Sequence, residues 1–105
     1  SDLVPDLVAM CAAARKPGQR VVAFALEDPA LLEQRATRKL QKKGVDAIVA
    51  NPLGTMESDF ITPMWLTAQG TRLTPGRMSK RDFAPWLIER VNELTTASTS
   101  STSPN

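Results

Sequence analysis

The sequence predicts an α/β fold in which helices pack on a parallel sheet. Two short apolar runs, at residues 20–27 and 45–51, are typical of strands that are buried on both faces. Between them lies a helical pattern at 29–43 with short connections on both sides. Strand, helix and strand in this order form a right-handed parallel unit. A chain of 105 residues has room for one domain with one modest core.

A first helix is predicted over residues 5–15. Pro5 suits the first helical position, Asp6 suits the first turn, and a Pro-Gly pair at 17–18 ends the run. We interpret the apolar run that follows as a central strand of the sheet, covered on both faces.

The second helix carries its own start and stop signals. Asp28 can cap a helix whose first residue is Pro29, and Gly44 supplies the C-terminal stop. Its apolar side is a row at four-residue spacing: Leu32, Ala36 and Leu40. The second strand, 45–51, leads into a loop at 52–56 that is rich in Pro, Gly and Thr. Ligands commonly bind at this carboxyl end of parallel strands.

A β-hairpin is predicted after this loop. Residues 62–68 and 71–74 flank a Gln-Gly pair, and the first strand is expected to begin at Pro63, which marks a strand end or an edge. Trp65 in this hairpin and Trp86 further along are interpreted as core or interface anchors.

The last helix is predicted from about 80 to 95. Ser79 with an acidic residue three positions later resembles a capping box at its start. Pro85 is expected to bend the helix or to delay its regular start to about Ala84. Residues 96–105 are rich in Ser and Thr and are expected to form a disordered tail.

Composition excludes several classes of protein. No stretch approaches the roughly 20 apolar residues of a membrane span, and the first residues are acidic and polar, so a soluble, cytoplasmic protein is expected. Cys11 is the single cysteine, and the chain has no histidine, which argues against disulfides within the chain and against zinc or haem sites. Cys11 lies among alanines and is predicted to be buried and inert.

The second helix carries a row of cations. Arg35, Lys39 and Lys43 recur at four-residue spacing, and Arg38 and Lys42 flank them. Like charges at this spacing oppose helix formation by a few tenths of a kcal/mol per pair, and an anionic partner such as a triphosphate would offset that cost. From spacing alone, a solvated basic face is the favoured interpretation, and a phosphate site is the alternative.

Other candidate residues also have two interpretations. Phe24 would pack in the core by default, or stack on a nucleobase at the end of its strand. Asn51 is usually a turn former, although its amide could bond a ligand. The start of the first helix at Pro5 and Asp6 is commonly only a cap, although its free N–H groups could receive an anion. No Gly-rich phosphate loop and no nucleophile with an adjacent base is present.

The order of several segments carries a resemblance. VPDL, VVAFALED, ATRKLQKKGVDAIVAN, SDF and SKRDFAPWLIERV follow one another over residues 3–94. This order resembles the C-terminal half of phosphopantothenate–cysteine ligase, the synthetase domain of the bifunctional flavoprotein of coenzyme A biosynthesis. The expected domain spans 1–95, followed by the tail at 96–105.

The resemblance implies a Rossmann-like fold that binds CTP. With Mg²⁺, such a ligase activates the carboxylate of 4′-phosphopantothenate as an acyl-cytidylate, and cysteine then displaces CMP. Phe24 would lie beside the nucleotide. Lys39 and Lys43 would be the two lysines that contact the nucleotide, although an alignment forward from Phe24 places the first of them at Arg38. Four consecutive residues would meet the cytosine end: Val4, Pro5, Asp6 and Leu7. No bound flavin is expected in this part.

Departures from the family pattern accompany the resemblance. The family's N-terminal half, with its Gly-rich turn and catalytic asparagine, has no counterpart here, so the chain alone is not expected to catalyse the ligation. Ile61 replaces a common asparagine, and Pro52 replaces a polar residue, changes that bear on nucleotide selectivity. The hairpin corresponds to a segment that helps pair subunits, so a homodimer, or association with a missing N-terminal half, is expected.

Two other functions stay open. A non-catalytic binding or regulatory module could keep the fold without the chemistry. A nucleic-acid-binding domain ranks last, because the net charge is only +2 and no aromatic residues interleave with the cations.

Overall fold

The computed structural model describes residues 6–54 and 58–101. The helices and strands follow one another in this order: α1 (Leu7–Ala14), β1 (Val22–Glu27), the 3₁₀ turn η1 (Pro29–Leu31), α2 (Leu32–Lys43), β2 (Ala47–Pro52), β3 (Phe60–Ile61), β4 (Met64–Thr67), β5 (Arg72–Leu73), β6 (Met78–Ser79) and α3 (Lys80–Ser101).

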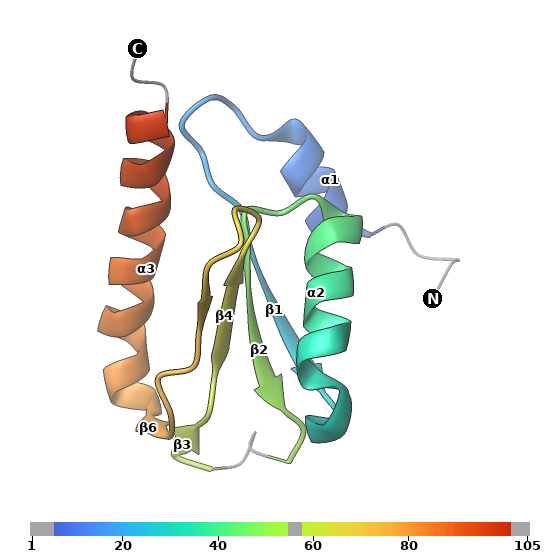
Figure 1. Cartoon of the computed structure of the whole chain (residues 1–105), viewed down its shortest axis with the longest axis vertical. Helices are drawn as coiled ribbons and strands as arrows, with labels where there is room; N and C mark the ends of the chain where they lie inside the picture. The colour runs from blue at the N-terminus through green and yellow to red at the C-terminus, as the bar shows by residue number, and fades with distance from the viewer. Residues whose placement is uncertain (1–5, 55–57, 102–105) are drawn as a thin grey trace.

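Four strands form one sheet in the order β1-β2-β4-β5, and β3 pairs with β6 separately. β1 and β2 run parallel without a register break, from Val22 opposite Ala47 to Glu27 opposite Pro52. β4 runs antiparallel to β2, and β5 antiparallel to β4, so the predicted hairpin adds antiparallel strands to a parallel pair. The sheet lies between α3 on one face and α1 with α2 on the other (Figure 1). The predicted three-layer α/β fold, with a hairpin and a C-terminal helix, is confirmed.

Each face of the sheet has its own core. The core under α1 and α2 contains Ala12, Ala23, Ala36, Leu40, Val45, Ile48, Ala50, Met64 and Leu66. The core under α3 contains Ala47, Val49, Trp65 and Leu94, with Val22, Leu73, Phe83, Trp86, Leu87 and Val91 packed against it. Trp65 is 1% exposed, and the Trp86 ring meets it edge-on at 6.4 Å between centroids, which confirms both tryptophans as packing anchors.

The prediction that β1 is a central strand covered on both faces is wrong for the described chain. β1 is an edge strand, and two of its side chains, Phe24 and Leu26, are 62% and 38% exposed. Successive side chains of a strand point to opposite faces, and Val22 packs in the core under α3, so Phe24 and Leu26 lie on that face as well. An apolar run shows that a strand needs cover, and it does not show which segment provides that cover.

Local signals placed the bounds of α2 well. Asp28 accepts a hydrogen bond from Ala30 N at 2.9 Å, as a cap should. The first residues form the 3₁₀ turn η1, because Leu31 N donates to Asp28 O at 2.9 Å, and the α-helix proper begins at Leu32. Gly44 ends it with a φ of 66°, the left-handed conformation that glycine adopts most easily.

The predicted start of α3 at about 80 is confirmed, and one of the two predicted effects of Pro85 is not. Ser79 Oγ accepts a hydrogen bond from Asp82 N at 3.0 Å, and the helix begins at Lys80 with Pro85 inside it. The predicted delay to Ala84 is therefore wrong. α3 also continues to Ser101, past the predicted helix end near 95, and no Gly or Pro interrupts that stretch. The expected disorder from 96 stays a prediction. The rest of the predicted tail, 102–105, lies outside the described residues.

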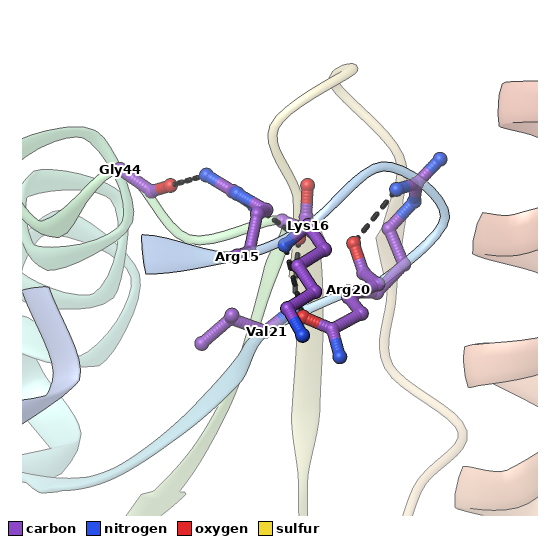
Figure 2. A network of polar contacts seen from close by, with 7 residues as sticks. Arg15, Lys16, Arg20, Val21 and Gly44 are labelled. Atoms are coloured by element: carbon purple, nitrogen blue, oxygen red, sulfur yellow. Dashed lines mark hydrogen bonds and ion pairs between the residues drawn. The ribbon is translucent and has the colours of Figure 1, made fainter. Parts of the chain in front are cut away.

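Asp46 joins three elements at the amino ends of β1 and β2. Its carboxylate accepts a hydrogen bond from Val21 N at 2.8 Å and forms an ion pair with Arg15, which also donates to Gly44 O (Figure 2). Lys16 N donates to the side chain of Gln19 at 2.9 Å in the same turn. This network fixes the end of α1 and the start of β1 against the end of α2, and so it fixes where the last turn of α2 lies.

Cys11 is exposed, so its predicted burial is wrong. α1 is a short helix that buries only one of its residues fully, Ala12, and the cysteine lies on the other side. Within residues 6–54 and 58–101, none of the helices combines the length and the apolar character that crossing a bilayer requires.

Candidate functional site

A cationic cavity of about 360 Å³ lies beside α2. Its lining consists of five cations and two carboxylates: Arg35, Arg38, Lys39, Lys42, Lys43, Asp6 and Glu27. All five cations of the predicted basic row therefore line the same cavity. Their charges exceed those of the two carboxylates by three, so the cavity favours an anionic ligand.

The cavity exists because α2 has two different sides. Ala36 and Leu40 are buried against the sheet, which turns the neighbouring cationic row toward the open edge at β1. Glu27, at the carboxyl end of β1, contacts Lys39 of this row, and Asp6, at the start of α1, contacts Lys43. The start of α1, the end of β1 and one side of α2 thus build the site.

The two predicted nucleotide lysines have carboxylate partners of different kinds. Lys39 Nζ forms an ion pair with Glu27, whose side chain is only 4% exposed. Lys43 Nζ forms an ion pair with Asp6, whose side chain is 40% exposed. The two pairs therefore differ in their carboxylates: that of Glu27 is buried, and that of Asp6 is open to solvent, while the lysines are 42% and 24% exposed.

Asp6 has two functions in the described chain. It caps α1, because its Oδ1 accepts a hydrogen bond from Ala9 N at 3.1 Å, and its Oδ2 contacts Lys43. The hydrogen bond from Lys43, and then that from the Ala9 backbone, hold the pKa of Asp6 below its ordinary value of 3.8. Asp6 is therefore ionised at neutral pH.

The remaining predicted site residues that the structure describes do not line the cavity. Phe24 and Asn51 lie on the α3 face of the sheet, since Asn51 follows Val49 by two residues in β2. Asn51 Oδ1 is buried and accepts no hydrogen bond from the described residues. Leu7 is 68% exposed at the start of α1, and Val4 and Pro5 lie outside the described residues.

The structure therefore brings Asp6, Arg38, Lys39 and Lys43 together, whereas Phe24 and Asn51 lie on the opposite face of the sheet. Sequence reasoning missed Glu27. A signal was present: a carboxylate that closes an otherwise apolar strand needs a partner, and the cations of α2 were the available ones.

Comparison with known proteins classifies the chain. Residues 2–94 match the family model of the DNA/pantothenate metabolism flavoprotein C-terminal domain. The chain belongs to this family. The resemblance described from the sequence is thereby confirmed. No curated protein sequence matches the chain.

Solved structures of similar fold include three with related descriptions. The C-terminal domain of the coenzyme A biosynthesis bifunctional protein CoaBC matches with a TM-score of 0.74 at 20% identity, over 90% of this chain and 43% of that one. A Cab2 mutant in complex with phosphopantothenate-cysteine matches with 0.64 at 17% identity, over 91% and 32%. The DNA/pantothenate metabolism flavoprotein from Streptococcus pneumoniae matches with 0.62 at 19% identity, over 86% and 39%.

These likenesses support the fold at low identity. They also show that the chain spans less than half the length of each of these three solved chains.

Proposed function

We propose that this chain is the nucleotide-binding part of a ligase that uses CTP to join 4′-phosphopantothenate and cysteine in coenzyme A biosynthesis. Membership of the family supports a role in coenzyme A biosynthesis. The cationic cavity beside α2 is the observation that supports nucleotide binding. A triphosphate presents several charged oxygens, and five cations around one cavity match that chemistry.

Lys39 and Lys43 are the residues through which the phosphates would bind. Side chains four apart on a helix lie about 5–6 Å from each other at Cβ, so the two ammonium groups can reach adjacent phosphates. Arg38 lines the same cavity and can contribute a planar, bidentate contact. Ion contacts in a partly enclosed cavity are stronger than the same contacts on an open surface.

Mg²⁺ fits this arrangement as a companion of the nucleotide. Within residues 6–54 and 58–101, no cluster of three or more potential metal-ligating side chains is present. Mg²⁺ is commonly held by substrate phosphates with one or two carboxylates and water, and Asp6 is the solvent-accessible carboxylate at this cavity. The ion would neutralise phosphate charge there when it is bound.

The open edge of β1 supports a requirement for a second polypeptide part. β1 has an unpaired edge in the described sheet, and Phe24 and Leu26 beside it are exposed. An N-terminal half could add strands there and supply the groups that orient the acyl substrate, while the hairpin β4–β5 could pair subunits in a homodimer. We therefore propose that the chain by itself binds nucleotide without catalysing ligation.

A non-catalytic module of the same fold is the second candidate function. The observation in its favour is that Lys39 and Lys43 both already contact carboxylates. A ligand must share or displace those contacts.

Calorimetric titration separates the two candidates. CTP with Mg²⁺ should bind the wild-type chain, and Lys39→Ala combined with Lys43→Ala should weaken that binding more than tenfold, because two phosphate contacts are lost. Lys16→Ala is the matched control, since it removes an exposed positive charge outside the cavity. Absence of CTP binding to the wild type would favour the non-catalytic module. Equal weakening by Lys16→Ala would show that only net charge matters.

A further inference from the structure

Glu27 is the only charged residue that is buried among those the structure describes. It is 3% exposed and closes strand β1, on the face that packs against α2. A buried carboxylate is stabilised only if a partner offsets its loss of hydration. Its Oε2 atom contacts Lys39 Nζ.

Lys39 has an alternative that Glu27 lacks. The Lys39 side chain is 42% exposed and could extend into water, as lysines on helices commonly do. It instead turns toward the strand end. Ion pairs with a buried partner add little net stability compared with apolar residues of similar size. The main effect of this pair is therefore to position the ammonium group of Lys39.

The geometry leaves the lysine able to bind an anion. An ammonium group has three N–H donors, and contact with a single Glu27 oxygen leaves donors free to face the cavity. Because Glu27 already restricts the lysine, less rotamer entropy is lost when a phosphate binds. Lys43 differs, since its partner Asp6 is exposed and can be displaced by solvent or ligand.

We propose that Glu27 is a positioning residue, which holds the ammonium group of Lys39 at the cavity so that a nucleotide phosphate meets a fixed cation. This inference rests on the proposed nucleotide site for its purpose. The restraint of Lys39 by Glu27 is a property of the ligand-free chain and can be measured without nucleotide.

The first experiment measures the mobility of the Lys39 side chain by NMR relaxation of its ε-methylene group, without ligand. Glu27→Gln keeps the size of the side chain and removes its charge, so Lys39 should become as mobile as an exposed lysine such as Lys16. Glu33→Gln is the control variant. Glu33 lies in α2, as Lys39 does, but it pairs with Arg72 and lines the groove on the other side of that helix. Equal mobility of Lys39 in the wild type and in Glu27→Gln would overturn the proposal.

The second experiment is a double-mutant cycle for CTP affinity at high salt, where long-range attraction is screened. Glu27→Gln should weaken CTP binding about threefold to tenfold in the wild-type background. In the Lys39→Ala background it should not weaken binding, since the residue through which it acts is gone. Glu27→Asp should recover part of the affinity, because it restores a carboxylate.

Two results of the cycle would overturn the proposal. Tighter CTP binding by Glu27→Gln would mean that the carboxylate only repels the anion. Equal weakening in both backgrounds would mean that it acts through the fold. If CTP binds neither the wild type nor any variant, the proposed function fails. The mobility of Lys39 then still shows whether Glu27 restrains this side chain.

Discussion

Lys39 and Lys43 lie one turn apart on the same side of α2 and pair with different carboxylates. Lys39 contacts the buried carboxylate of Glu27, and Lys43 contacts the exposed carboxylate of Asp6. Removal of the first lysine therefore leaves a buried charge without its partner, whereas removal of the second leaves a carboxylate that water can hydrate.

This difference predicts unequal losses of stability. Lys39→Ala should lower the free energy of unfolding by about 1–3 kcal/mol, the range expected when a buried polar group loses its partner. Lys43→Ala should lower it by less, because water can hydrate the exposed Asp6 carboxylate that it leaves. Urea denaturation of the two variants at neutral pH measures both values. Equal losses would show that Glu27 does not depend on Lys39.

At this scale the sequence predicted which residues carry charge and left open what they contact. The four-residue spacing of Lys39 and Lys43 placed them on one side of a helix, and they do line one cavity. Glu27 escaped notice because its pairing joins the end of a strand to the middle of the following helix. The face to which Phe24 points also depends on packing partners, and the apolar run around it did not reveal them.

α1 and α2 are joined across the cavity by Asp6 and Lys43. The pKa of Asp6 is lowered in the folded chain, so the folded state holds the ionised form more strongly than the unfolded state does. The resulting stabilisation is fully present above the ordinary pKa of 3.8 and is lost as the pH falls through the lower, folded value.

Asp6→Asn tests this coupling between the helices. Asparagine still caps α1, since its side-chain oxygen can accept from the Ala9 backbone, but it cannot form the ion pair with Lys43. The wild type should be more stable than Asp6→Asn at about pH 6. The difference should shrink at a pH below 3.8, as the pH falls toward the lowered pKa of the folded state. Chemical denaturation at both pH values gives the comparison. A difference that persists at the lower pH would assign the effect to the cap.

Element bounds could be predicted where one residue decides them. Asp28, Gly44 and Ser79 each mark a helix end through a hydrogen bond or a backbone conformation that a short stretch of sequence encodes. The two-residue pair of β3 with β6 was not predicted, because strands so short leave no periodic pattern. The edge position of β1 was also missed, since it depends on which other strands are present.

The whole molecule combines a nearly complete core with one open flank. Both faces of β2 and β4 are covered, while β1 has an unpaired edge, with the cationic cavity on the α2 face and exposed apolar side chains on the α3 face. In the described part of the chain, α2 supplies the cations of the cavity at this flank.

The most direct test of the central claim is a chemical-shift map of the full chain during titration with CTP and Mg²⁺. Resonances of Glu27, Lys39 and Lys43 should shift together and saturate at one affinity, because a single triphosphate contacts that cavity. Shifts confined to the groove between α2 and the hairpin, around Thr37 and Thr67, would contradict a nucleotide site beside β1. So would the absence of any shift on the cationic side of α2.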